Sequence, residues 1–192
     1  MTAATKTDQD LIDDCLQGRT EAFGELVVRY QNRLYTTLVS LLNSAEDARD
    51  VAQEAFVNAF QKLHTFRGQS AFYSWLFRIA LNSAVSYQRK QSRVLVSIDA
   101  ARETTGLEPV SRHPESDPGF AMDVSERQAL VRAALAELPE EYRTVLVLKE
   151  VDDLKYEEIA EIVDCPIGTV RSRIHRARVE LRAKLEILLK RQ

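Results

Sequence analysis

The sequence predicts an all-α fold of two small helical domains, an N-terminal helical bundle and a C-terminal helix-turn-helix, joined by a flexible linker. Apolar residues recur at spacings of three and four through residues 8–96 and 125–192, and no segment alternates apolar and polar residues as a strand does. Residues 97–124 hold three of the five prolines and two of the six glycines, with little periodicity. That composition is typical of a linker and divides the 192-residue chain in two.

The composition argues against several protein classes. Hydrophobic residues make up 45% of the chain, enough for a core, but no apolar run approaches the roughly 20 residues that span a bilayer. The first ten residues lack the basic start and apolar stretch of a secretory signal. Cys15 and Cys165 form no CxxC pair, and the three histidines are scattered. We therefore expect a cytoplasmic protein without a disulfide framework, metal or cofactor.

The first two helices of the N-terminal domain follow from capping residues and spacing. Asp8 or Asp10 can cap a short helix that ends near Gly18. A second helix follows from Thr20 and is broken at Asn43. Its apolar residues recur at three and four: Phe23, Leu26, Val27, Tyr30, Leu34, Leu38 and Leu41.

Two more helices complete the predicted bundle. Ser44, with Asp47 three residues later, resembles a capping box and opens the third helix. Residues 65–70 form a loop, and the fourth helix starts at Ser70 and runs through Lys90.

The sequence of the C-terminal domain predicts a helix-turn-helix. "SERQ" at residues 125–128 is a capping box before the first helix, and Pro139 stands where the first turn of a helix accepts proline. The periodic stretch "YEEIAEIVD" is followed by a break at Cys165-Pro166 and then by the basic stretch "IGTVRSRIHRARVELR". Two short helices around such a break, the second one basic, have the form of a helix-turn-helix.

Charge is distributed unevenly, although the net charge is only −3. Residues 55–98 contain six basic residues and no acidic one, and residues 171–192 contain eight basic and two acidic residues. Acidic segments precede and separate these two stretches. Two basic segments suggest two contact surfaces for polyanions such as nucleic acids, whereas a solvated basic face is the alternative for each segment alone.

On a helical wheel, the basic helix divides into a core stripe and an open face. The core stripe consists of Ile167, Val170, Ile174, Ala177 and Leu181. Thr169, Ser172 and Arg176 lie opposite, flanked by Arg173, on the face that is free to enter a major groove. The remaining long polar side chains point sideways, towards phosphates rather than base edges: Arg171, His175 and Arg178.

The acid-free segment interleaves aromatic and cationic residues. The aromatic members are Phe66, Phe72, Tyr73, Trp75, Phe77 and Tyr87, and the cations among them begin with Arg67 and Arg78. Aromatic rings beside cations suit single-stranded nucleic acid, because bases stack on the rings while the cations follow the backbone. The alternative is a core role, since helical spacing places Trp75, Ile79 and Phe72 on one face.

An acidic stripe runs along the third predicted helix. Asp47, Asp50 and Glu54 recur at spacings of three and four, with Gln53 beside them. The stripe is either a solvated face or a docking surface for a basic protein. Paired carboxylates without a nucleophile, base or metal do not indicate catalysis, so we expect no enzyme.

Three segments, in order, resemble the extracytoplasmic-function (ECF, group IV) sigma factors of bacterial RNA polymerase, and in particular their envelope-stress, sigma-E-like subgroup. "EDARDVAQEAFVNAFQKL" is similar to the family's segment that docks on the clamp helices of the polymerase β′ subunit. "TFRGQSAFYSWLFRIALNSA" resembles its promoter-melting and −10-reading segment. "LPEEYRTVLVLKEVDDLKYEEIAEIVDCPIGTVRSRIHRAR" resembles its −35-reading domain, and "DCPIGTVRSRI" is the most specific stretch.

The resemblance implies a sigma factor that binds core RNA polymerase and promoter DNA. Residues 8–96 would correspond to sigma region 2 and residues 125–192 to region 4, with the acidic linker between them. The resemblance also assigns polymerase contacts to Asp50, Gln53 and Glu54. An anti-sigma factor is a further partner that the family leads us to expect.

The resemblance also implies the DNA-contacting residues. Phe66 and Asn82 would help to hold a flipped base of the −10 element, in a set that also includes Trp75 and Arg78. Lys149 would hold a phosphate at the −35 element. The other −35 contacts would come from the basic helix: Thr169, Arg171, Ser172, Arg173, His175 and Arg176.

Two positions before "YEEIA" depart from the family pattern. Asp153 and Lys155 replace the common glycine and serine, and the second replacement removes a helix-capping hydroxyl. The alternative function is a free-standing helix-turn-helix repressor or activator. Such a protein would need a dimerisation element, and no long terminal heptad supplies one.

Overall fold

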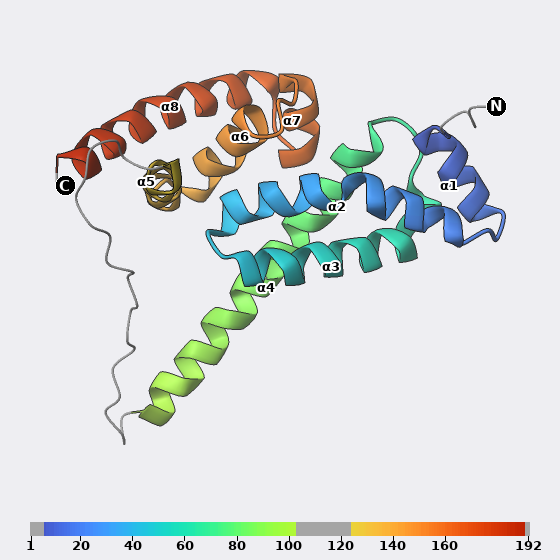
Figure 1. Ribbon diagram of the computed structural model, residues 1–192, viewed down its shortest axis with the longest axis horizontal. Coiled ribbons are helices and arrows are strands. Elements are labelled where there is room, and N and C mark those ends of the chain that lie inside the picture. The colour runs from blue at the N-terminus through green and yellow to red at the C-terminus, as the bar shows by residue number, and fades with distance from the viewer. Residues whose placement is uncertain (1–5, 103–123, 191–192) are drawn as a thin grey trace.

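The computed structural model describes the backbone of residues 6–102 and 124–190 and the side chains of residues 6–87 and 126–190. In these ranges the chain forms eight α-helices, one 3-10 helix and no strand, so the predicted all-α class is confirmed (Figure 1). In chain order the elements are α1 (Asp8–Leu16), α2 (Glu21–Leu42), α3 (Ala45–Lys62), η1 (Leu63–Thr65), α4 (Phe72–Arg102), α5 (Val124–Ala136), α6 (Glu140–Glu150), α7 (Tyr156–Val163) and α8 (Ile167–Leu189).

Helix α1 is capped by a residue other than the predicted ones. The Thr7 hydroxyl accepts a hydrogen bond from the Asp10 backbone N–H (3.2 Å), and the Asp10 carboxylate accepts one from the Thr7 backbone N–H (2.9 Å). The prediction that Asp8 or Asp10 is the N-cap is therefore wrong, because Asp10 fills the reciprocal position of a capping box opened by Thr7. The Thr7 hydroxyl also donates to the Asp10 carboxylate (2.6 Å), and this bond together with that from the Thr7 backbone N–H lowers the pKa of Asp10.

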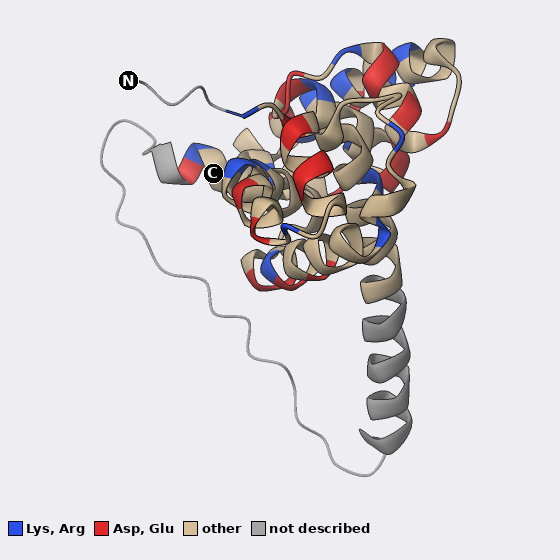
Figure 2. Cartoon of the chain, turned by 90° about the vertical axis from the view of Figure 1, so that its right-hand side faces the viewer, with Lys and Arg blue, Asp and Glu red and all other residues tan. Residues whose placement is uncertain are grey.

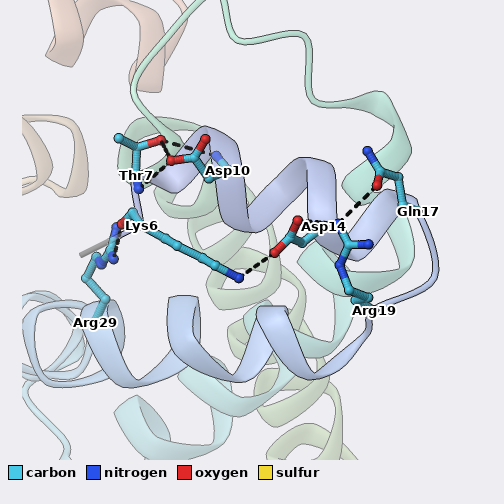
Figure 3. A network of polar contacts seen from close by, with 7 residues as sticks. All are labelled: Lys6, Thr7, Asp10, Asp14, Gln17, Arg19 and Arg29. Carbon is cyan, nitrogen blue, oxygen red and sulfur yellow. Dashed lines mark hydrogen bonds and ion pairs between the residues drawn. The ribbon is translucent and has the colours of Figure 1, made fainter. Parts of the chain in front are cut away.

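A polar network fastens α1 to α2 (Figure 3). Asp14 accepts hydrogen bonds from Lys6 (2.6 Å) and from Arg19, and these two bonds lower its pKa. Arg29 on α2 donates to the carbonyl oxygen of Lys6 (2.8 Å) and to the carboxylate of Asp8. The network is close to solvent, so it orients the N-terminal helix rather than dominating its stability.

The turn between α2 and α3 is made as the sequence predicts. Asn43 ends α2 in the left-handed region, with φ of 53°. The Ser44 hydroxyl then accepts from the Asp47 backbone N–H (3.2 Å) and caps α3. The Asp47 carboxylate reaches across to α4, where it accepts from the Tyr87 hydroxyl (2.9 Å).

Helix α4 begins at Phe72 rather than Ser70 and continues to Arg102, past the predicted end at Lys90. Residues 97–102, placed in the linker by their composition, are therefore helical in the structure. Most of the predicted linker, residues 103–123, lies outside the described residues. Helix α5 begins at Val124, so Ser125 lies inside the helix and the predicted capping box at 125–128 is displaced from its start.

The predicted helix-turn-helix is present as α7, a tight turn and α8. Asp164 ends α7 with φ of 49°, and Pro166 precedes the first residue of α8. The predicted core stripe of α8 is confirmed at Val170, Ile174 and Ala177, which are buried. Leu181 packs against the same core. Ile167 was predicted in this stripe but is 36% exposed, because it occupies the first position of α8 beyond the packed part of the core.

The two halves of the chain, α1–α4 and α5–α8, contact each other. Helices α2 and α4 of the N-terminal half touch α5, α6 and α7 of the C-terminal half. Apolar side chains fill each half, with Leu26, Leu38 and Phe77 fully buried in the first and Leu146 and Ile159 in the second. None of the helices described has the combination of length and apolar character that crossing a bilayer takes.

Candidate nucleic-acid interface

Helix α8 presents most of its predicted DNA-contacting residues to solvent. Arg171, Ser172, His175 and Arg176 are exposed, and Thr169 and Arg173 are half-buried. This distribution follows from the core stripe, because burying one side of the helix turns the opposite side outwards.

Several of these side chains already have partners. Arg173 donates to the carboxylate of Glu141 on α6 (2.7 Å), and the Ser172 hydroxyl donates to the backbone oxygen of Thr169 (2.9 Å). The Tyr142 hydroxyl raises the pKa of Arg176 by hydrogen bonding to its charged form. A guanidinium is a cation over the whole physiological range without any such shift, so Arg176 can contact a phosphate or a guanine.

Arg178 was predicted to point sideways towards phosphates. It instead donates two hydrogen bonds to Glu150 on α6 (3.0 and 2.6 Å). This ion pair joins α8 to α6, so Arg178 makes a structural contact in the free protein.

Lys149 lies at the end of α6, next to α8. Its ammonium donates to the Asp153 carboxylate (2.9 Å) and to the Leu154 carbonyl (3.1 Å), and the hydrogen bond to Asp153 raises its pKa. The Tyr156 ring joins Lys149 to α8: the Lys149 ammonium is 5.9 Å and the Arg171 guanidinium 5.8 Å from the ring centroid. Lys149 and Arg171 therefore form one cationic edge.

The four predicted −10 residues come together around one cavity of about 540 Å³. We call it the −10 cavity; its lining residues are Thr65, Phe66, Arg67, Gln69, Ser70, Trp75, Arg78, Ile79, Asn82 and Glu161. Its volume falls in the range of about 300–1,000 Å³ that is usual for ligand pockets.

An aromatic cluster shapes the wall of the −10 cavity. The ring of Phe66 meets those of Trp75 and Phe72 edge to face, with centroids 5.3 and 5.8 Å apart. Phe72 is buried, as its core role predicts, whereas Trp75 and Ile79 are only half-buried and line the cavity. Aromatic faces, a guanidinium and an amide in one hollow suit a nucleobase that has left its stack.

Glu161 is a lining residue that the sequence did not indicate. It comes from α7 in the C-terminal half, while the other residues of the −10 cavity come from η1, α4 and the loop between them. A second cavity of about 730 Å³ continues from the same place and lies between the halves. We call it the inter-half cavity; its polar lining residues are Arg78, Asn82, Glu140, Glu141, Thr144, Asp164 and Arg173. Only the packing of the two halves brings these residues together.

The predicted polymerase-contacting residues Asp50, Gln53 and Glu54 are all exposed on α3. Gln53 also lines a groove of about 500 Å³ between α2 and α3. The groove contains Tyr35 and Phe56, and exposed Val57 stands at its side. The acidic stripe is predictable from the sequence but this apolar component is not, because the same residues fit the helical core pattern.

Charges of both signs occur along the same helices in the described part of the chain (Figure 2). Basic residues are therefore interspersed with acidic ones in this part of the chain rather than spread over one whole face. Among the described side chains no three of His, Cys, Asp and Glu gather as a metal site requires.

Both halves match known sequence families. Residues 26–94 match the family described as Sigma-70 region 2, and residues 128–181 match Sigma-70, region 4. The ECF RNA polymerase sigma-E factor of Escherichia coli (strain K12) is 44% identical over 187 residues, which cover 96% of this chain and 97% of that protein. The protein of the same description from Haemophilus influenzae is 42% identical over 185 residues, covering 95% and 97%.

Two solved structures share the fold. CnrH, solved in complex with the cytosolic domain of CnrY, gives a TM-score of 0.70 at 27% identity and covers 95% of this chain and 99% of its own. The sigma factor RpoE of Bartonella quintana, solved with the anti-sigma factor NepR, gives a TM-score of 0.67 at 28% identity, with 86% and 97% covered. By sequence over nearly its whole length, and by fold, the chain belongs to the ECF RNA polymerase sigma factors.

Proposed function

We propose a division of labour among residues for the promoter-specific transcription initiation that this sigma factor directs. The −10 cavity takes a flipped base of the −10 element, α8 reads the −35 element, and the exposed stripe of α3 docks on core RNA polymerase. The protein is not an enzyme. The single observation that carries the scheme is that Phe66, Trp75, Arg78 and Asn82 line one cavity.

In the −10 cavity, Phe66 and Trp75 offer ring faces and edges for stacking, and Asn82 offers an amide that can both donate and accept. Arg78 is exposed at the rim and meets the backbone of the melted strand. Flipping a base costs a few kcal/mol, and stacking together with hydrogen bonds in the cavity offsets that cost.

At the −35 element, Arg176 and Ser172 enter the major groove, with Thr169 and Arg173 beside them. Arg171, His175 and Lys149 contact phosphates on the flank. The exposure of Arg171, Ser172, His175 and Arg176 supports this arrangement, as does the Tyr156 ring that holds Lys149 near Arg171.

Core polymerase docks on α3 through Asp50, Gln53 and Glu54, and the groove beside Gln53 receives an apolar side chain of the polymerase. An exposed acidic stripe next to an apolar groove suits a basic, amphipathic partner helix. The clamp helices of β′ are the partner that the family resemblance implies.

We also propose a binding partner, domain boundaries and a cellular location for this chain. RpoE of B. quintana was solved with an anti-sigma factor, and we propose that an anti-sigma factor also binds this protein. The region 2 and region 4 matches support domains at residues 8–96 and 125–192, with a connecting segment at 97–124 whose first six residues continue α4. Because a sigma factor acts together with RNA polymerase, we also propose that the protein is cytoplasmic.

The decisive experiment combines the purified protein with core RNA polymerase on genomic promoter fragments. We expect specific transcripts only when both proteins are present. A free-standing helix-turn-helix regulator would instead bind a palindromic site tightly without polymerase, and that result would rule out the proposed scheme.

Two variants separate the proposed surfaces. We expect Arg176→Ala to abolish use of the −35 element and to retain polymerase binding, because one groove-reading pair is worth about 1–3 kcal/mol. Asp50→Arg should impair polymerase binding and leave the fold intact, because Asp50 is exposed. Gel-shift titration of the holoenzyme and co-purification with core polymerase measure the two effects.

Matched controls come from the same kinds of position. Arg182→Ala removes an exposed arginine further along α8, and Asp13→Arg reverses an exposed acid on α1. Both should behave like the wild type in both assays. Loss of polymerase binding in Arg176→Ala, or unchanged polymerase affinity in Asp50→Arg, contradicts the division of labour.

A further inference from the structure

A buried carboxylate joins the two halves of the chain. Asp152, just after α6, has a side chain only 1% exposed. Its Oδ1 accepts from Arg33 Nε (3.0 Å), its Oδ2 from the Tyr73 hydroxyl (2.8 Å) and its backbone oxygen from Arg33 Nη2 (2.9 Å). Arg33 lies on α2 and Tyr73 on α4, so all three bonds run from the C-terminal half to the N-terminal half.

The partners of Asp152 also contact each other and Thr37. The guanidinium carbon of Arg33 lies 3.9 Å from the centroid of the Tyr73 ring, and Thr37 Oγ1 is 3.5 Å from the Tyr73 hydroxyl. Burial, and then the nearby charge of Asp152, raise the pKa of Tyr73, so the phenol keeps its proton and remains a donor. Both carboxylate oxygens of Asp152 therefore have a partner, as a buried charge requires.

This contact places acidic residues of the C-terminal half against the −10 surface. Glu161 of α7 lines the −10 cavity itself. Glu141 and Asp164 line the adjoining inter-half cavity together with Arg78 and Asn82. An approaching DNA strand would meet these carboxylates as well as the bulk of α7, and both oppose the entry of a polyanion.

The −35 surface is also engaged in this arrangement. Arg173 lines the inter-half cavity together with Arg78 and Asn82, while its ion pair with Glu141 lies within the C-terminal half. Residues of both proposed DNA-reading surfaces therefore line one cavity between the halves.

We propose that Arg33, Tyr73 and Asp152 form a latch that holds the free protein in a closed, self-capped form, in which α7 covers the −10 cavity until polymerase or promoter DNA opens it. The capping role rests on the proposed function of the −10 cavity. The latch itself rests only on the contacts between the halves.

The chemistry of the latch suits reversible closure. On opening, Asp152 regains its hydration, whereas the Arg33 side chain is already 41% exposed in the closed form. Because burying the carboxylate costs hydration, this ion pair contributes little net free energy compared with an apolar interface. The interface beside the latch is loosely packed: a cavity of about 560 Å³ lies between α2, α5 and Val151. Exposed Val131 and Val151 line it, so apolar contact there is incomplete.

The first test measures the shape of the free full-length chain by small-angle X-ray scattering. We expect Asp152→Ala and Arg33→Ala each to increase the radius of gyration, and the double variant to add little, because the two residues act through one contact. Tyr73→Phe keeps the ring and removes one bond, so it should open the protein less. Glu150→Ala is the matched control, since Glu150 pairs with Arg178 within its own half.

The second measurement is the affinity of the free chain for a fluorescent single-stranded oligonucleotide carrying a −10 sequence from a promoter that the holoenzyme uses. A minor open state is commonly populated at about 10% or less. Variants that open fully should then bind about tenfold more tightly or better, because apparent affinity scales with the competent fraction. Glu150→Ala should leave this affinity unchanged.

The outcomes distinguish the two levels of the inference. An unchanged radius of gyration in both Asp152→Ala and Arg33→Ala, with circular dichroism showing that the helices are retained, overturns the latch. A larger radius without tighter oligonucleotide binding overturns the capping of the −10 cavity. The proposed function is tested separately by Asn82→Ala in holoenzyme transcription: normal transcription there refutes the −10 assignment and leaves the scattering result standing.

Discussion

Asp152 and Asp153 are neighbours with opposite surroundings. The side chain of Asp152 is 1% exposed and bonded to the other half of the chain, whereas that of Asp153 is 93% exposed and paired with Lys149. Asp153 also adopts φ of 50°, a conformation that glycine takes without strain and that aspartate tolerates better than most residues. That backbone conformation explains why glycine is common at this position in the family that the sequence resembles.

The sequence predicted the residues of the −10 cavity because they sit within one short stretch, from Phe66 to Asn82, with a recognisable order. It did not predict the role of Asp152 or Glu161. Their partners lie in the other half of the chain, and no local spacing encodes such a contact.

We expect Asp153→Asn to strengthen binding of the −35 duplex by the holoenzyme about two- to fivefold, the range that one exposed ion pair supports. Asparagine tolerates the left-handed backbone, so the turn is kept. The change releases the Lys149 ammonium from a carboxylate 2.9 Å away and removes a negative charge near the DNA phosphates. Fluorescence anisotropy with a labelled −35 duplex at fixed salt measures the effect.

Glu157→Gln is the matched control, because it neutralises an exposed carboxylate on α7 that is not bonded to Lys149. A gain in Asp153→Asn that also occurs in Lys149→Ala/Asp153→Asn would show that Lys149 is not responsible. Equal gains in Asp153→Asn and Glu157→Gln would point to net charge alone.

At the scale of elements, the helices were predictable and their ends less so. Long amphipathic stretches such as α2 and α3 repeat the apolar pattern over many turns, and the pattern survives in the structure. Ends depend on one or two side chains: Thr7 caps α1, and α4 runs on to Arg102. Composition favoured a linker from residue 97, but a helix already formed can extend into a weakly periodic segment because each further residue adds one hydrogen bond.

Helix α7 is only half capped. The backbone N–H of Lys155 donates to the Glu158 carboxylate (2.8 Å), which is the reciprocal bond of a capping box. A lysine side chain has no acceptor, so it cannot return a bond to the backbone N–H of Glu158. The replacement of serine by lysine, noted from the sequence, therefore leaves one donor of the first turn without a cap.

We expect Lys155→Ser to complete the capping box and to raise the free energy of unfolding by about 1 kcal/mol. Lys155 already has extended backbone angles, with φ of −71° and ψ of 154°, so serine needs no rearrangement. Urea denaturation followed by circular dichroism measures the change. Lys155→Ala is the control for loss of the lysine alone, and a stabilisation as large as that of Lys155→Ser would contradict the capping mechanism.

For the whole molecule, the sequence predicted two helical units and a linker but not their contact. The division was visible because proline, glycine and acidic residues change in frequency at the linker. The contact of α2 and α4 with α5, α6 and α7 includes the hydrogen bonds from Arg33 and Tyr73 to Asp152. Those residues are unremarkable in their local patterns, and nothing within one half requires them to meet.

Contact between the halves should make them unfold together. Trp75 is the single tryptophan and reports on the N-terminal half, while the buried amides of α6, from Val145 to Leu148, report on the C-terminal half. Coincident transitions by different observables are the mark of one cooperative unit. In the wild type, we therefore expect urea midpoints from Trp75 fluorescence and from hydrogen exchange of α6 to agree.

In Asp152→Ala the two midpoints should separate, because the halves lose the polar contact that links their stabilities. Glu150→Ala removes a carboxylate whose partner, Arg178, lies in the same half, so its midpoints should still coincide. Separate midpoints already in the wild type would mean that the latch does not couple the halves thermodynamically. Coincident midpoints in Asp152→Ala would mean that the remaining contacts of α4 with α7 are sufficient, and that Asp152 is not the residue on which closure depends.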